Sequence, residues 1–176
     1  MGHYLGSVKD VLNTNYDGVN QEITTSVWMQ ERWTDRFLYW DPELFNGIHE
    51  IRLPHEDVWT PDTYLYNNLE MEQSQVERRM NVLVRPNKTA RIAIVEMRYP
   101  AILRTSCIMS VRYFPFDSQN CLLIFGSWTY DNYHIDYFAE QENVTLKYLI
   151  RNQEWDIVAF YAERVVTLVL GDTLFF

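Results

Sequence analysis

Residue types that commonly carry catalytic or metal-binding chemistry are scarce in this sequence. It has only two cysteines and four histidines, and the histidines at positions 3, 49, 55 and 134 show no metal-ligand spacing. It also lacks a Gly-x-Ser-x-Gly segment and a glycine-rich phosphate loop. We therefore predict that the chain is not an enzyme and that it holds no metal and no cofactor.

Long apolar runs, flexible residues and positive charge are scarce as well. No run reaches the roughly 18 apolar residues that a membrane-spanning helix needs. Glycine and proline number six each, which excludes a fibrous or disordered class. The net charge of −9 argues against nucleic acid as a partner, since nucleic acid calls for basic patches. A negative field of this kind attracts cations, including cationic ligands.

Aromatic residues are the abundant class, with 12 tyrosines, nine phenylalanines and six tryptophans. With 47% hydrophobic residues, a chain of 176 residues can bury the core of one ordinary domain. No repeat, linker or low-complexity tract divides the sequence. We therefore expect residues 1–176 to form a single domain.

Hydrophobic periodicity predicts one short helix and many strands. Apolar residues at helical spacing predict an amphipathic N-terminal α-helix over residues 4–12. From Ile23 the period becomes two, which places Trp28 on the polar face of a strand. Further strands are predicted at residues 80–85, 91–99, 108–113, 121–126, 144–150, 155–161 and 165–170. Many short strands separated by turn residues are typical of an antiparallel β-sandwich or barrel.

The two cysteines, Cys107 and Cys121, bracket thirteen residues with Phe-Pro-Phe-Asp near the centre. A lone pair around so short a loop predicts a disulfide, which would contribute about 3 kcal/mol through loop closure. In the cytosol such residues would normally be free thiols. However, Asn87 and Asn143 each begin a glycosylation sequon, Asn-Lys-Thr and Asn-Val-Thr. Together the cysteines and sequons predict an extracellular glycoprotein.

Five segments resemble one family, in that family's own order. Residues 28–35 have the pattern Trp-x-x-x-x-Trp-x-Asp, and residues 58–67 contain Trp-x-Pro-Asp-x-x-x-Tyr-Asn. The loop between the cysteines, Gly-Ser-Trp at residues 126–128 and Glu-Trp-Asp at residues 154–156 follow. The chain therefore resembles the extracellular ligand-binding domain of nicotinic-type Cys-loop receptors, which are pentameric ligand-gated ion channels, or a soluble acetylcholine-binding protein.

The resemblance implies a fold, an assembly and a function. The fold would be all-β, an antiparallel sandwich of about ten strands with a short N-terminal α-helix. Identical subunits would form a homopentamer on the extracellular face of the plasma membrane, or a secreted one. In a channel, a membrane domain would follow this chain. A small molecule, by default a cholinergic amine, would bind between subunits and be coupled to cation flow.

The resemblance also assigns residues to that site. The principal face of one subunit would contribute Tyr66, Trp128 and Tyr161. The complementary face of its neighbour would contribute Trp28, Glu96 and Arg98. Aromatic faces stabilise a desolvated cation by about 2 kcal/mol, which is why several rings converging on one point suit an amine.

Two further roles follow from the same motifs. The tip of the cysteine loop would couple ligand binding to the channel; its residues are Phe114, Pro115, Phe116 and Asp117. We expect Asp62 to hold together a hydrogen-bond network or a turn, rather than to act as a catalytic carboxylate.

The chain departs from the family pattern at two places. After Glu-Trp-Asp, residues 157–170 lack the adjacent cysteines of agonist-binding subunits and leave Tyr161 as the one available tyrosine. The long strand that the family places before the Trp28 strand has no obvious counterpart. A structural subunit that binds no agonist is therefore an alternative function. Because Glu96 and Arg98 are charged, we expect them either to pair with each other or to contact a polar ligand.

Overall fold

The computed structural model describes residues 3–70, 80–131, 133–139, 142–152, 154–166 and 173–175. Within these residues it has ten strands: β1 (His3–Asp17), β2 (Glu22–Asp35), β3 (Ile51–Pro54), β4 (Thr63–Leu65), β5 (Asn81–Asn87), β6 (Ile92–Ser106), β7 (Phe125–Ser127), β8 (Asp136–Phe138), β9 (Arg164–Val166) and β10 (Thr173–Phe175). Two short 3-10 helices are η1 (Pro42–Phe45) and η2 (His55–Asp57). The predicted all-β class is confirmed.

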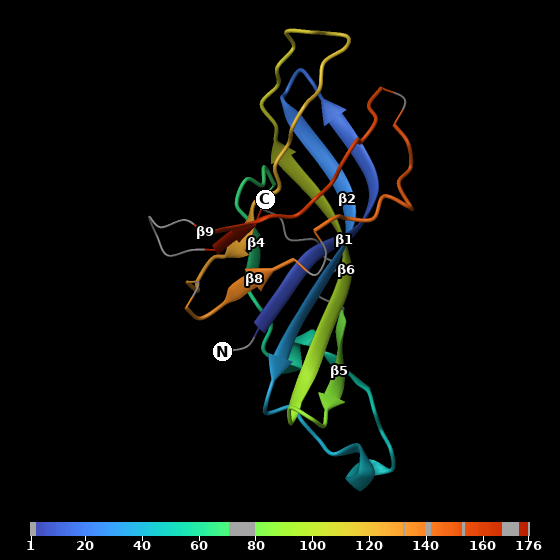
Figure 1. The fold of residues 1–176 in the computed structure, drawn as a ribbon, viewed down its shortest axis with the longest axis vertical. Helices are drawn as coiled ribbons and strands as arrows, with labels where there is room; N and C mark the ends of the chain where they lie inside the picture. The colour runs from blue at the N-terminus through green and yellow to red at the C-terminus, as the bar shows by residue number, and fades with distance from the viewer. Residues whose placement is uncertain are drawn as a thin grey trace.

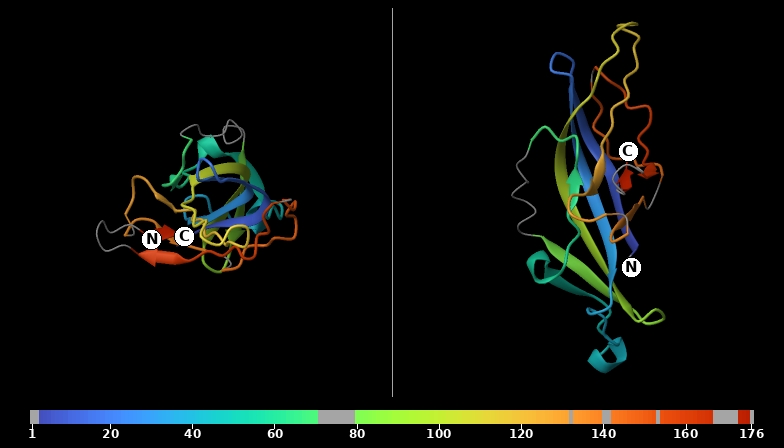
Figure 2. Two further views of the ribbon diagram at one scale, coloured as in Figure 1. Left: turned by 90° about the horizontal axis from the view of Figure 1, so that it is seen from above. Right: turned by 90° about the vertical axis from the view of Figure 1, so that its left-hand side faces the viewer.

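The strands form two sheets that pack as a sandwich. The larger sheet has the order β3-β5-β6-β2-β1-β8, and the smaller one has the order β4-β7-β10-β9. All pairings are antiparallel except that of β1 with β8. The long strands β1, β2 and β6 run along the length of the molecule, and the short strands β4, β8 and β9 lie to one side of them (Figure 1). The view along the long axis shows the same arrangement (Figure 2).

The N-terminal helix predicted over residues 4–12 is wrong, because these residues belong to β1. The register of β1 against β2 shifts twice, which leaves Lys9 and Leu12 as extra residues. Each bulge reverses the alternation of faces, so Val8 and Val11 are both buried although they are three positions apart. A doubly bulged strand therefore produced the apolar spacing of a helix.

β1 also supplies the long strand that was expected before the Trp28 strand. A tight turn joins it directly to β2. The Asp17 carboxylate accepts hydrogen bonds from the backbone N–H groups of Val19 and Asn20, each at 3.0 Å. The short connection after Asp17 is therefore a hairpin turn.

The other strand predictions had mixed outcomes. The strands predicted at residues 80–85 and 91–99 correspond to β5 and β6, and the one at residues 121–126 overlaps the start of β7. Residues 108–113 and 144–150 are instead turns, irregular segments and isolated bridges.

The remaining two predictions concern the C-terminal part. Residues 155–161 lie outside the strands, and the prediction for residues 165–170 falls mostly outside the described residues. Val158, within the strand predicted at residues 155–161, and Ile150, within the one predicted at residues 144–150, are exposed. Alternation of apolar and polar residues was therefore insufficient to predict a strand in segments that form loops on the surface.

The core lies on the inner face of the larger sheet, where it meets the smaller sheet. Val95, Met97 and Tyr99 alternate along β6 and are buried there. One polar pair lies within this core, since the Tyr99 hydroxyl donates a 2.8 Å hydrogen bond to the buried Glu31 carboxylate. The outer face of β2 and β6 points away from this core.

The cysteine loop lies at one end of the long axis, next to the β1–β2 turn (Figure 1). The backbone N–H of Cys107 donates a 2.8 Å hydrogen bond to the carbonyl oxygen of Gln21, which ties the base of the loop to that turn. In the described part of the chain, neither short helix has the length or apolar character of a membrane span.

Candidate functional site

Three aromatic rings gather on one face of the smaller sheet, across β4 and β7. Tyr64 lies 5.2 Å from Trp128 and 6.0 Å from Tyr66, measured between ring centroids. Tyr66 and Trp128 are separated by 6.0 Å. Gly126 is directly opposite Tyr64 in the register, and since it has no side chain it leaves room for the rings. The predicted residues Tyr66 and Trp128 are thus brought together.

The cluster is open to solvent on one side. The Trp128 side chain is 68% exposed and that of Tyr66 is 38% exposed. The faces of exposed aromatic rings carry negative charge density and attract cations. The arrangement is suited to receive a cationic group, and chemically it offers no nucleophile.

Asp62 holds the Trp128 segment in place. Its carboxylate accepts hydrogen bonds from the Ser127 hydroxyl at 2.5 Å, from the Thr129 backbone N–H at 2.8 Å and from the Thr129 hydroxyl. Burial by itself would raise the pKa of Asp62, but these hydrogen bonds outweigh it and the pKa lies below its ordinary value. The expected network role of Asp62 agrees with these contacts.

Trp28 lies on a different face of the subunit. Its neighbours on β2, Val27 and Met29, are 0% and 4% exposed and point into the core, whereas Trp28 is 42% exposed. Because successive side chains of a strand alternate, Trp28 points away from the smaller sheet. It therefore lies on the opposite face of the larger sheet from the Tyr66–Trp128 cluster.

Glu96 and Arg98 lie on the same outer face as Trp28 and pair with each other. Glu96 is 3% exposed, and its carboxylate accepts a hydrogen bond from the Arg98 guanidinium. It also accepts a 3.3 Å hydrogen bond from Arg85 Nη1, and Arg32 Nη2 lies 4.0 Å away. The structure therefore places one buried carboxylate among three guanidinium groups, on the face of the larger sheet that also carries Trp28.

Tyr161 lies at the wall of an apolar cavity between the sheets. Val8, Phe125, Tyr137 and Phe160 also line this cavity. The Tyr161 backbone forms an isolated bridge with Asn143, while its side chain is 57% exposed.

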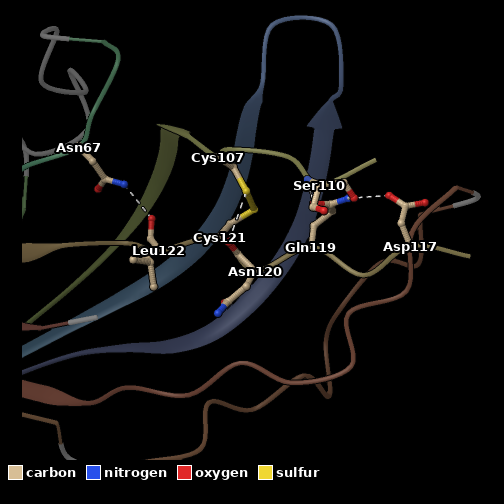
Figure 3. The surroundings of a disulfide bond; sticks show 8 residues. All are labelled: Asn67, Cys107, Ser110, Asp117, Gln119, Asn120, Cys121 and Leu122. Carbon is tan, nitrogen blue, oxygen red and sulfur yellow. Dashed lines mark hydrogen bonds between the residues drawn. A yellow bond between two sulfur atoms is a disulfide. The ribbon is translucent and has the colours of Figure 1, made fainter. Parts of the chain in front are cut away.

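The cysteines form the predicted disulfide, with Cα atoms 5.1 Å apart (Figure 3). Inside the loop, the Gln119 side chain is hydrogen-bonded to both backbone groups of Ser110, at 3.0 and 3.1 Å, and donates to Asp117. At the tip, Phe114 and Phe116 are 76% and 92% exposed. The loop is therefore internally braced and presents two apolar rings to its surroundings.

Asn67 connects the base of this loop to the aromatic cluster. Its side-chain amide donates a 2.8 Å hydrogen bond to the carbonyl oxygen of Leu122 (Figure 3). Its oxygen accepts one of 3.1 Å from the Ile124 backbone N–H. The adjacent Tyr66 N–H donates to the Ile124 carbonyl at 2.8 Å. The segment that follows Cys121 is thus attached to the residue next to Tyr66.

Sequence comparison assigns the family. The family described as neurotransmitter-gated ion-channel ligand binding domain matches residues 8–169. This chain belongs to that family. The resemblance drawn from the motifs is therefore confirmed, as is the prediction that the chain is not an enzyme, since this is a family of ion-channel domains.

Relatives of this ligand-binding domain include subunits from nematode and human. The acetylcholine receptor subunit alpha-type des-2 of Caenorhabditis elegans is 41% identical over 138 residues, covering 78% of this chain. The neuronal acetylcholine receptor subunit beta-3 of Homo sapiens is 42% identical over 144 residues, or 81% of this chain. The betaine receptor acr-23 of Caenorhabditis elegans is 38% identical over 147 residues, or 82% of this chain. The match spans 25%, 30% and 27% of these three relatives' lengths.

Membership in a family of receptor extracellular domains places this domain on the extracellular side. The two sequons lie at the surface of the ligand-binding domain. Asn87 ends β5 and is half-buried, with its side-chain oxygen accepting a 3.1 Å hydrogen bond from the Ala90 N–H. Asn143 is exposed.

Sequence reasoning missed Tyr64, Arg32 and Arg85. Tyr64 had a usable signal, because it lies two positions before Tyr66 and a strand places both on one face. The contacts of the arginines with Glu96 had none, since they depend on the pairing of β6 with β2 and β5, which local sequence does not encode.

Proposed function

We propose that residues 1–176 form the extracellular ligand-binding domain of one subunit of a pentameric cation channel. A small amine binds between neighbouring subunits of a homopentamer, and its binding is coupled to channel opening. Family membership supports the general class. The acidic charge of the chain and the exposed ring cluster favour a cationic ligand.

The observation that carries this proposal is the placement of two exposed tryptophans. Trp128 projects from the smaller sheet, and Trp28 projects from the outer face of the larger sheet. One copy of the chain therefore holds two half-sites that point in different directions. When each subunit presents its Trp128 face to the Trp28 face of the next, the contact is head-to-tail, which is the type of contact that forms a closed ring when the rotation between subunits allows it.

The cysteine loop is the coupling element in this proposal. Asn67 joins the Tyr66 segment to the segment that follows Cys121. A change in ring positions on ligand binding would act on the base of the loop, and the exposed tip from Phe114 to Asp117 would contact a membrane domain. Such coupling works only if the ligand has different affinity for the closed and open states.

The test is a binding titration of the assembled protein with a quaternary amine such as choline. Replacing Trp128 by alanine should weaken binding roughly thirtyfold, which corresponds to about 2 kcal/mol. Phe37→Ala is the matched control, because it removes a ring that is 99% exposed elsewhere on the surface. Unchanged affinity in Trp128→Ala, or equal losses in both variants, would contradict the proposed site.

A second candidate is a structural subunit that assembles but binds no agonist on its principal face. Its supporting observation is that residues 157–170 lack adjacent cysteines and leave Tyr161 as the one available tyrosine. For such a subunit, no amine would change the Tm of the assembled protein. A third candidate function is a soluble binding protein, which would bind the amine but carry no ion current.

A further inference from the structure

We propose that Asn143 carries an N-linked glycan whose first N-acetylglucosamine packs into a surface pocket of the same subunit, against the ring of Tyr161. Asn143 begins the sequon Asn-Val-Thr, and both residues line this pocket. The pocket lies where the chain that follows β8 meets the chain that leads into β9. The proposal goes beyond the proposed function and does not depend on which ligand the domain binds.

The backbone places Asn143 directly beside Tyr161. The two residues form an isolated antiparallel bridge, and the hydrogen bonds that flank it are donated by the N–H groups of Val144, at 3.0 Å, and Ala162, at 2.8 Å. Asn143 and Tyr161 are therefore a non-hydrogen-bonded pair, the type in which the Cα atoms are about 4.5 Å apart and the side chains are closest. Both residues are exposed. A sugar on the asparagine amide thus begins within reach of the tyrosine ring.

The size and lining of the pocket suit a sugar. Its volume is about 500 Å³, which is within the range of small-molecule pockets, about 300–1,000 Å³. Phe138 and Tyr161 line it together with Glu142 and Glu163. A pyranose ring has the complementary character. Its C–H face packs on an aromatic face, which carries negative charge density, and its hydroxyl groups donate hydrogen bonds to carboxylates.

Arg164 adds a donor that is fixed in position. Its Nε and Nη2 donate hydrogen bonds of 3.1, 2.7 and 3.0 Å to the carboxylate of Asp136 on β8. Its Cζ atom lies 4.9 Å from the centre of the Phe138 ring. Within the described part of the chain, the Nη1 group of Arg164 has no hydrogen-bond partner. Because a guanidinium has five N–H donors, Nη1 can donate to the acetamido carbonyl oxygen of the sugar.

The charges of the pocket favour a neutral occupant over an anion. The positive charge of Arg164 is paired with Asp136, and Glu142 and Glu163 contribute two exposed carboxylates. A phosphate or carboxylate ligand would therefore be repelled, whereas an uncharged polyol meets hydrogen-bond acceptors on these residues.

Attachment of the glycan requires a lipid diphosphate-linked oligosaccharide as donor. The amide nitrogen of Asn143 forms a bond to C1 of the N-acetylglucosamine, and the bond between C1 and the diphosphate oxygen breaks. The lipid diphosphate leaves with that electron pair, and the amide nitrogen loses one proton. No electron is gained or lost overall, so the step needs no oxidant or reductant.

The packed sugar braces the connection between β8 and β9. Asn143 and Tyr161 join these two segments through an isolated bridge, and the sugar adds a contact across the same pair. It also covers the Tyr161 ring, whose residue is 57% exposed. Tyr161 then contacts the glycan of its own subunit instead of a ligand between subunits.

The experiment uses the full chain secreted by insect cells, in a Thr89→Ala background. This change removes the other sequon and leaves the hydrogen bond between Asn87 and Ala90 in place. Mass spectrometry should find the glycan on Asn143. Removing the whole glycan with an amidase should lower the Tm by about 2–4 °C, the shift that corresponds to about 1 kcal/mol in a domain of this size. Trimming with an endoglycosidase that leaves the first sugar should preserve the Tm.

Variants of the aromatic platform identify the contact. In Tyr161→Ala, removal of the whole glycan should no longer lower the Tm, whereas Tyr161→Phe, which keeps the ring, should retain the decrease. Tyr133→Ala is the matched control, because it removes another ring that is 72% exposed, and it should retain the decrease as well. An unmodified Asn143 in the secreted protein would overturn the proposal. Equal Tm values for the trimmed and fully deglycosylated proteins, or an undiminished decrease in Tyr161→Ala, would do the same.

Discussion

The Tyr66 hydroxyl donates a 2.6 Å hydrogen bond to the backbone carbonyl oxygen of Ser127, the residue immediately before Trp128. The two most important candidate rings are therefore linked through the backbone as well as by ring contact. Ser127 also donates its hydroxyl to Asp62. The backbone before Trp128 is thus held by the Tyr66 hydroxyl and, through the Ser127 hydroxyl, by Asp62.

Replacing Tyr66 by phenylalanine removes this hydrogen bond and keeps the ring. We expect a loss of about 1 kcal/mol in the free energy of unfolding and, because Trp128 becomes less well held, an affinity loss of a few fold. Thermal unfolding and probe titration measure the two effects. Tyr133→Phe, at a tyrosine that is 72% exposed, should change neither quantity. A Tyr66→Phe variant as stable and as tight-binding as the wild type would show that the bond is unimportant.

Asp62 should make the Trp128 segment sensitive to acid. Its folded-state pKa lies below the ordinary value, because hydrogen bonds from Ser127 and Thr129 outweigh the effect of burial. Ionised Asp62 therefore stabilises the folded state. This stabilisation is fully present above the unfolded-state pKa of about 3.9 and is lost as the pH falls through the folded-state pKa. Asp62→Asn should therefore unfold at lower temperature than the wild type at neutral pH.

The two proteins should approach each other in Tm as the pH falls below about 4. Tm measured from neutral pH to pH 3 checks this. Asp57→Asn, which changes an exposed carboxylate nearby, should follow the wild-type curve. A constant difference between Asp62→Asn and the wild type over the whole range would rule out the proposed ionic role.

Replacing both Cys107 and Cys121 by serine should destabilise the domain by about 3 kcal/mol, because the disulfide closes a loop of about fifteen residues. Thermal unfolding with and without a reducing agent provides an internal control. Reductant should lower the Tm of the wild type to that of the double variant and leave the double variant unchanged. An unaltered wild-type Tm on full reduction would mean that the loop is held by its other contacts, such as those of Gln119.

The placement of Trp28 and Trp128 predicts complementation between two inactive chains. Homomeric Trp28→Ala and homomeric Trp128→Ala should each bind the amine weakly. Co-expression in equal amounts should restore tight binding at about one interface in four, where an intact Trp128 face meets an intact Trp28 face. Saturation binding gives the number of restored sites. No restoration, despite shown co-assembly, would place both tryptophans in one subunit's own site or in none.

Several features were readable from local sequence. The alternation around Trp28 correctly indicated an exposed indole, since Val27 and Met29 are buried on either side of it. The spacing of Cys107 and Cys121 predicted their disulfide. Both inferences depend only on residues close together in the chain, for which strand geometry and loop closure are sufficient.

The N-terminal segment was not readable in the same way. Residues 4–12 have the apolar spacing of a helix, and only pairing with β2 shows that Lys9 and Leu12 are bulged residues. The same holds for Arg85, whose contact with Glu96 arises from β5–β6 pairing. Long-range register is a property of the whole sheet, so no local pattern could have predicted these contacts.

The sequence by itself determined the class of this protein, because ordered motifs from Trp28 to Trp155 and the cysteine loop are specific to one family. It also placed Tyr66 and Trp128 in the candidate site. Only the tertiary structure decided that Tyr64 completes their cluster, that Tyr161 lines a cavity between the sheets, and that Glu96 is buried among arginines on the sheet face that carries Trp28. The physical reason is that a sequence motif depends on residues close together in the chain. The shape and charge of a binding surface depend instead on side chains from distant strands, which only the sheet register brings together.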